Sequence, residues 1–236
     1  MHASSFYKKV FDFFANVLYP SFCVSCDAGG EWWCHDCQNS VEKIHGTICP
    51  RCLFIGEHEC SGTLPFNSVT ACGYYHDPKL RAIITALKFQ GATIVLQNLR
   101  NFLTKKTAFD SRVMTYDLSA VIVPMPLAAK RFNERGFNQA ELLAQVFKAS
   151  YNLRQPIEAE ILVRTQMRHA QSSLEHDLTL RAKNISGSFA CRSKPPRSVI
   201  LVDDVATTGA TAAEAAKILK ENGADTVDLM VLAVGA

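Results

Sequence analysis

The sequence predicts an α/β fold, in which helices cover both faces of a mostly parallel sheet, preceded by a small cysteine-rich module. Two observations lead to this prediction. After residue 62, short apolar runs alternate with amphipathic helical segments, which is the pattern of parallel strand–helix units. Seven of the nine cysteines, in contrast, lie between residues 23 and 60. We therefore expect an N-terminal amphipathic helix in residues 1–22, a metal-binding module in 23–62 and the α/β domain in 63–236.

The composition limits the class of protein. A chain of 236 residues, 48% of them hydrophobic, can bury one α/β core and still carry a smaller module. No stretch reaches the ~18 uninterrupted apolar residues of a membrane span, and Lys8, Lys9 and Asp12 interrupt the apolar stripe near the start. The sequence thus predicts a soluble, cytoplasmic protein whose first helix docks on its own fold.

The positive charge is unevenly distributed. The net charge is +3, but residues 1–72 hold more acidic than basic side chains. The basic excess concentrates in residues 164–197, where only Glu175 and Asp177 are acidic. Such a segment suits a phosphorylated ligand or a nucleic acid backbone, although a solvated basic loop would look the same.

The cysteines predict two structural zinc sites. Three Cys-x-x-Cys pairs, "CVSC", "CHDC" and "CPRC", are followed by "GEHEC". Two such pairs complete a tetrahedral, closed site. Disulfides are disfavoured because seven is an odd number and no signal peptide is apparent. The predicted ligands are Cys23, Cys26, Cys34 and Cys37 for the first site, and Cys49, Cys52, His58 and Cys60 for the second.

The cysteine-rich segment is too short to build a core of its own, so metal binding should supply much of its folding free energy. Its role is architectural, or it holds a partner or a nucleic acid. Trp32 and Trp33 stand between the first two pairs. They could stack on a base or cover the metal site.

The rest of the chain divides into strands and helices. "SVTACGYYH" alternates like a strand, and "DPKLRAIITALKFQG" begins a helix with Asp77 as N-cap. "SAVIVPMPL" is a short apolar strand, after which Arg131, Arg135 and Gly136 lead into a helix. "VILV" starts a further strand, Gly223 ends the helix that follows it, and "TVDLMVLAV" is the last strand.

The stretch "VILVDDVATTGAT" predicts a binding site, because ligands of such sheets bind beyond the carboxyl ends of the strands. The turn 206–211 should direct backbone N–H groups and threonine hydroxyls at one point, where a helix begins at Thr211. These groups make a monophosphate pocket, and Gly209 lets the backbone close around the anion.

Asp203 and Asp204 would repel a phosphate, so they should hold another part of the ligand. Vicinal hydroxyls donate to carboxylates, and a phosphate with a diol nearby describes a ribose 5-phosphate. A Walker-type triphosphatase is excluded because the chain has no G-x-x-x-x-G-K-[ST] loop. The predicted phosphate and ribose contacts are Asp203, Asp204, Ala206, Thr207, Thr208, Gly209, Ala210 and Thr211.

These blocks resemble known families. "VILVDDVATTGAT" is similar to the signature of type I phosphoribosyltransferases, which bind phosphoribosyl pyrophosphate. The whole chain resembles the ComF family, which is linked to DNA uptake in natural transformation. This second resemblance rests on the order of the "CxxC" pairs, "LKFQG", "PMPL…RGFNQAELLA" and the signature. The resemblance implies a type I phosphoribosyltransferase-like fold, Mg²⁺ with the phosphoribosyl pyrophosphate, and a mobile flap in residues 164–183. The pyrophosphate and flap contacts it implies are Arg131, Arg135, Gly136, Arg164, Arg168 and Arg181.

Two functional interpretations follow. In one, the chain is a DNA-uptake factor that binds phosphoribosyl pyrophosphate or single-stranded DNA, with the zinc sites mediating assembly with the uptake machinery. In the other, it is an active phosphoribosyltransferase in which Asp203, Asp204 and Arg135 act on an unidentified amine or nucleobase acceptor. Thr207 cannot readily act as a base; His169 and His176 in the flap are the alternatives.

Overall fold

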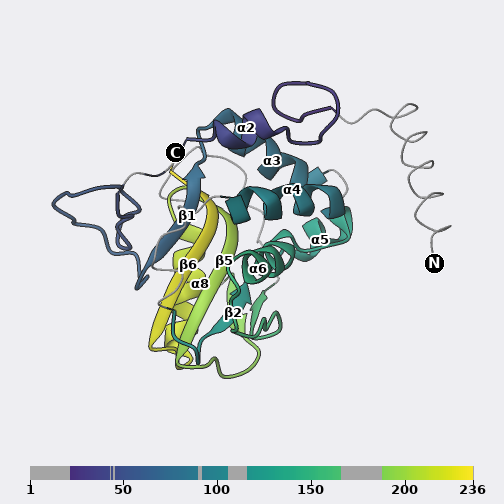
Figure 1. Ribbon diagram of the computed structural model, residues 1–236. Helices are drawn as coiled ribbons and strands as arrows, with labels where there is room; N and C mark the ends of the chain where they lie inside the picture. The colour runs from purple at the N-terminus through teal and green to yellow at the C-terminus, as the bar shows by residue number, and fades with distance from the viewer. Residues whose placement is uncertain are drawn as a thin grey trace, which may run out of the picture.

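The computed structural model describes residues 22–42, 44, 46–89, 92–105, 116–165 and 188–235, and Figure 1 gives their arrangement. The helix expected in residues 1–22 lies outside the described residues, except for Phe22. No helix within these ranges is long and apolar enough to cross a lipid bilayer.

A four-stranded sheet forms the centre of the fold, and all of its pairings are parallel. The order is β1-β6-β5-β2, so the two long strands lie in the middle. They are apolar almost throughout, as expected of strands that are covered on both faces. The strands are β1 (Val69–Tyr74), β2 (Val121–Pro124), β5 (Ser198–Ala206) and β6 (Thr226–Val234).

Helices cover both faces of this sheet, as the sequence predicts. Ile200 and Val202 of β5 share one core cluster with α3 (Pro78–Phe89), α4 (Ala92–Lys105) and α6 (Gln139–Ser150). The alternate residues Val199 and Leu201 belong to a second cluster with α8 (Ala210–Glu221). Because successive side chains of a strand point to opposite faces, β5 separates the two cores. The predicted α/β architecture is therefore confirmed.

Asp77 caps helix α3 as the sequence predicts. Its Oδ1 accepts hydrogen bonds from the backbone N–H groups of Lys79 (2.8 Å) and Leu80 (3.2 Å). Its Oδ2 accepts a third from Glu42 N–H at 2.6 Å. These bonds hold the pKa of Asp77 below its usual value despite burial of the carboxylate. One side chain thus starts α3 and ties the cysteine-rich segment to it.

Two elements near the sheet's carboxyl edge differ from the sequence expectation. Arg131 and Arg135, which the sequence predicts only to lead into the next helix, lie on a separate short helix of their own, α5 (Ala129–Arg135). Gly136, at φ 77°, ends this helix in the left-handed conformation that favours glycine. A small antiparallel pair, β3 (Leu162–Arg164) and β4 (Phe189–Cys191), brackets most of the predicted flap. Residues 166–187 of the chain lie outside the described ranges.

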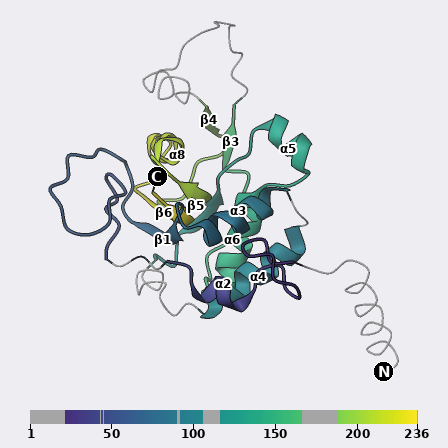
Figure 2. The same cartoon turned by 90° about the horizontal axis from the view of Figure 1, so that it is seen from above.

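The cysteine-rich segment packs against both cores. Cys23 and Cys37 belong to the cluster of α3 and α4, and the short α2 (His35–Asn39) lies over α3 in Figure 1. Ile48 and Leu53 belong instead to the cluster of α8. Figure 2 shows the same separation from above, with the second half of the segment beside β1.

Candidate functional site

A polar pocket of about 260 Å³ lies where β2 and β5 end. Its walls come from four regions of the chain: the end of α3, the segment after β2 with α5 and the start of α6, the end of β3, and β5 with the start of α8. This is the carboxyl edge of the sheet, where ligands of open α/β folds bind. The lining residues are Lys88, Met125, Pro126, Leu127, Arg131, Arg135, Asn138, Gln139, Ala140, Arg164, Asp203, Asp204, Val205 and Thr211.

The two aspartates lie near the carboxyl end of β5, which continues to Ala206. Asp203 Oδ1 accepts a hydrogen bond from Asp204 N–H at 2.8 Å. Asp204 Oδ2 lies 2.8 Å from Lys88 Nζ, and both of these side chains are mostly buried. Lys88 is the lysine of the "LKFQG" block, so α3 delivers a cation to the acidic pair.

Asp203 is held in an environment that favours its neutral form. Removal from water and the negative charge of Asp204 raise the pKa of Asp203 to about 7, although the Asp204 N–H, Lys88 and Arg164 act in the opposite direction. Additional hydrogen-bond donors would stabilise the charged form of the Asp203 carboxylate. The site therefore favours a ligand that brings hydroxyl or cationic groups to Asp203.

Next to Asp203 a second cavity of about 50 Å³ is formed by the turn after β5. A water needs roughly 10–15 Å³, so this cavity accepts a group of several atoms. Gly209 adopts φ 73° there and precedes the first residue of α8, Ala210, one position before the predicted start. The helix N-terminus and the Thr207 and Thr208 hydroxyls surround a space that suits an anion.

Three arginines also line the larger pocket. Arg131 and Arg135 come from α5, and Arg164 comes from the end of β3. The Arg164 guanidinium lies 5.2 Å from the centre of the Phe189 ring, its neighbour in the β3–β4 pair. Burial and the charge of Arg131 lower the pKa of Arg164, while Asp203 raises it. The pocket is thus lined by both acidic and basic side chains.

The structure brings most of the predicted site residues together. Asp203, Asp204 and residues 206–211 line one or both cavities, and so do Arg131, Arg135 and Arg164. Gly136 ends α5 and is not among the lining residues. Arg168, Arg181, His169 and His176 lie outside the described residues. Sequence reasoning missed Lys88, Asn138 and Gln139, although the "LKFQG" and "RGFNQ" blocks contain them.

The turn that holds Gly209 is backed by the cysteine-rich segment. A methyl group added at Gly209 would lie 3.0 Å from Leu64 Cδ1 and 3.1 Å from Leu53 Cδ1. Leu53 directly follows Cys52 and adopts φ 66°, a conformation that L side chains rarely take. Leu53 N–H donates to Cys49 O at 2.9 Å, so its position depends on the turn between these two cysteines.

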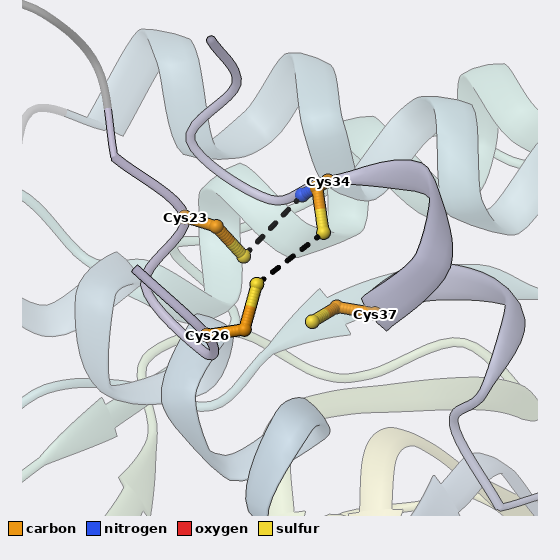
Figure 3. Close-up of side chains that lie close together, drawn as sticks. All are labelled: Cys23, Cys26, Cys34 and Cys37. Carbon is orange, nitrogen blue, oxygen red and sulfur yellow. Dashed lines mark hydrogen bonds between the residues drawn. The ribbon is translucent and has the colours of Figure 1, made fainter. Parts of the chain in front are cut away.

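The first cysteine group suits a tetrahedral metal ion (Figure 3). Cys23, Cys26, Cys34 and Cys37 place their sulfurs within 4.8 Å of one another, and Cys26 Sγ lies 3.6 Å from Cys34 Sγ. Thiolates on one zinc at 2.3 Å stand about 3.8 Å apart. Burial raises the pKa of Cys23, but hydrogen bonds led by Cys34 N–H outweigh it and lower the value to about 7. The donor set fits a structural metal such as zinc.

The second group has three thiols and an imidazole. Cys49, Cys52, His58 and Cys60 offer one ligand atom each within the same 4.8 Å limit. Cys49 Sγ lies 3.5 Å from Cys60 Sγ, and His58 Nε2 lies 3.1 Å from Cys52 Sγ. The geometry thus favours His58 as the fourth ligand, in agreement with the sequence prediction. This set also fits a structural zinc ion.

Trp33 does not face solvent. It is fully buried, and its ring centre lies 4.8 Å from that of Phe102 on α4. Trp32 is only partly buried. Trp33 therefore anchors the first cysteine group to the main core.

Comparisons with known proteins find relatives over most of the chain. The DNA utilization protein YhgH of Escherichia coli (strain K12) is 31% identical over 230 residues, which are 92% of this chain and 98% of that protein. Competence protein F of Haemophilus influenzae is 30% identical over 212 residues, 85% of this chain and 89% of the relative. Competence protein ComFC of Bacillus subtilis is 27% identical over 202 residues, 80% and 78% of the two chains. No family model matches the chain.

Proposed function

The chain belongs to the family of the DNA utilization protein YhgH and of the competence proteins F and ComFC, and from this premise we propose that it serves DNA uptake or utilization with a pocket that binds phosphoribosyl pyrophosphate. One observation carries the proposal. A small cavity at the N-terminus of α8 adjoins a pair of aspartates at the edge of a larger, arginine-walled pocket. A terminal phosphate, a pentose diol and a diphosphate match these three regions in order.

Each region would act on one part of the ligand. The turn after β5 would hold the 5-phosphate through N–H groups and threonine hydroxyls, and Asp203 and Asp204 would accept hydrogen bonds from the ribose hydroxyls. Arg131, Arg135 and Arg164 would neutralise the diphosphate. Mg²⁺, arriving with the ligand, would supply further positive charge to it.

Calorimetry with phosphoribosyl pyrophosphate and Mg²⁺ tests this proposal. We expect saturable binding to the wild-type protein and at least a tenfold weaker affinity for Asp204→Asn, since one charged acceptor for the diol is lost. Glu221→Gln, at the exposed end of α8, is the matched control and should bind like the wild type. Failure of the wild-type protein to bind phosphoribosyl pyrophosphate would refute the proposal.

Transfer of the phosphoribosyl group is the further activity that this pocket supports. The bond between C1′ and the diphosphate oxygen would break with its electrons leaving on the diphosphate, while an acceptor nitrogen bonds to C1′ and loses a proton. The arginine wall would stabilise the departing anion. Pyrophosphate release in the presence of amine or nucleobase acceptors, abolished by Asp204→Asn, is the expected result.

Single-stranded DNA is a second candidate ligand, favoured by the surface of α5. This helix buries none of its side chains and exposes Phe132 (47%) beside Lys130 and Arg131. An aromatic ring among cations is suited to a base and its backbone phosphates. We expect binding of a thymidine oligonucleotide to weaken steeply with salt, to survive Asp204→Asn and to fall when Arg164 and Arg168 are neutralised. Failure of the wild-type protein to bind the oligonucleotide at low salt would exclude this ligand.

A further inference from the structure

A buried amide in the pocket wall has no partner. Gln139, the first residue of α6, is only 4% exposed, and its Nε2 makes no hydrogen bond within the part of the chain that the structure describes. An unpaired buried donor destabilises the folded protein, because it has lost its hydrogen bonds to water. Most buried polar groups in native proteins are paired, so this amide requires an explanation.

The neighbouring Asn138 shows that the start of α6 is held without Gln139. Asn138 Oδ1 accepts from Ala140 N–H at 3.1 Å and caps the helix. Asn138 Nδ2 donates to Met125 O and to Glu141 Oε1, both at 3.1 Å. These bonds join α6 to the segment after β2. The Gln139 amide is therefore not needed to build the helix or its contact with the sheet.

The surroundings of Gln139 indicate what would satisfy it. The residue lines the pocket together with Arg131, Arg135 and Arg164, and it stands at the positive end of α6. A neutral N–H donor beside several cations complements an anion that has many oxygens, because each oxygen then receives a donor.

We propose that Gln139 Nε2 donates a hydrogen bond to a diphosphate oxygen of the bound ligand and thereby makes the pocket selective for a phosphoribosyl diphosphate over ribose 5-phosphate. This inference rests on the proposed function. It adds a specificity-determining residue to that function and explains why an amide without a partner is kept in the wall.

Calorimetry on the metal-loaded, full-length protein tests the role of Gln139 with three probes: phosphoribosyl pyrophosphate, inorganic pyrophosphate and ribose 5-phosphate, each with Mg²⁺. Gln139→Met keeps nearly the same volume and removes the donor. We expect this variant to bind the first two probes about tenfold or more weakly, as for loss of a hydrogen bond to a charged group. Its affinity for ribose 5-phosphate should be unchanged. Gln139→Glu, which places a negative charge there, should weaken the diphosphates further.

Unfolding of the ligand-free proteins provides the structural control. Gln139→Met should unfold at the same or a higher urea concentration than the wild type, because the orphaned donor is gone. Gln155→Met is the matched variant: Gln155 is equally buried but donates to Asp117 O at 3.1 Å and does not line the pocket. It should lose stability and keep all three affinities.

The outcomes separate the two proposals. If the wild type binds ribose 5-phosphate and the diphosphate ligand while Gln139→Met binds both as well as the wild type does, the role of Gln139 is refuted and the proposed function stands. If Gln139→Met binds ribose 5-phosphate and the diphosphate ligands more weakly by the same factor, the selectivity assigned to Gln139 is also refuted. If the wild type binds none of the probes, both proposals fail.

Discussion

Two adjacent carboxylates of the same strand have different surroundings. Asp204 forms a close ion pair with Lys88, whereas Asp203 accepts a hydrogen bond from a backbone N–H and has a pKa raised to about 7. The difference follows from strand geometry, because neighbouring side chains of β5 face different layers. Asp204 faces the side of α3, from which Lys88 reaches it, and Asp203 lies beside the phosphate-sized cavity. Only a pocket that supplies donors would stabilise both as anions.

The raised pKa of Asp203 predicts how stability depends on pH. The folded protein holds this proton up to about pH 7, whereas a free carboxyl loses it near 3.8. The contribution of Asp203 to the free energy of unfolding therefore falls as the pH rises from about 4 to 7. In urea titrations across this range, Asp203→Asn should flatten that fall and be more stable than the wild type at pH 8. An unchanged pH profile would contradict this prediction.

Lys88 should control the ionisation of the acidic pair. Its charge lowers the pKa of Asp203, so Lys88→Met should raise that pKa further. Ligand binding that needs ionised Asp203 should then begin at a higher pH, which calorimetry at a series of pH values would measure. Lys217→Met, in an exposed ion pair with Glu221, is the control. The same onset of binding in both variants would show that Lys88 has no such role.

At the scale of elements, the sequence predicts most of those with a local signal. Asp77 and Pro78 mark α3, the apolar runs mark β2, β5 and β6, and Gly223 marks the end of α8. Helix α4 was not anticipated, although Val95, Leu99 and Phe102 form a buried helical stripe. The pair β3 and β4 has only three residues in each strand and depends on contacts across the predicted flap.

In the candidate site too, residues with a local sequence signal are predictable, whereas residues brought in by tertiary packing are not. The acidic pair and the turn after β5 are consecutive in the chain, so the sequence alone predicts that they form one site. Lys88 and Gln139 are more than 60 residues from Asp203 and reach the pocket only through the packing of α3 and α6 on the sheet. Nothing local to these two residues indicates which face of its helix meets the pocket. Tertiary structure is required to assign them.

The Asp77 cap allows a test at the element scale. Asp77→Ala should destabilise the protein by about 1–3 kcal/mol, because the helix cap and the hydrogen bond from Glu42 N–H are both lost. Asp77→Ser keeps a capping oxygen but cannot also serve Glu42 N–H, so its loss should be about half as large. Urea unfolding monitored by circular dichroism measures both. Equal stabilities of the two variants would show that the cap contributes nothing.

At the scale of the whole molecule, the two cysteine groups support different cores. Cys23 and Cys37 of the first group belong to the cluster of α3 and α4, and Ile48 and Leu53, which lie next to cysteines of the second group, belong to the cluster of α8. Packing of the segment on both cores, together with the two metal-binding groups within it, would keep this short segment folded without a separate interior. Loss of metal should therefore loosen the protein at two places that can be observed separately.

Titration with a metal chelator should distinguish loss of metal from the first cysteine group from loss of metal from the second. The chain has two tryptophans, both beside the first group, and Trp33 packs on Phe102. Tryptophan emission should shift to longer wavelength when the first group loses its ion, and native mass spectrometry should count two metal ions per chain before treatment. Cys37→Ser should reproduce the shift, whereas Cys60→Ser should leave the emission unchanged. An identical shift in both variants would contradict independent sites.

The contact of Leu53 and Leu64 with Gly209 has a consequence for affinity. The anion-holding turn rests on side chains that come from a loop some 150 residues earlier, and that loop keeps its shape through Cys49 and Cys52. A side chain at position 209 would clash with Leu53 and Leu64. Displacement of these two leucines would leave the backbone of the turn after β5 less well ordered. If the turn holds a phosphate as proposed, metal loss at Cys49 and Cys52 should weaken phosphate binding through Leu53 and Leu64.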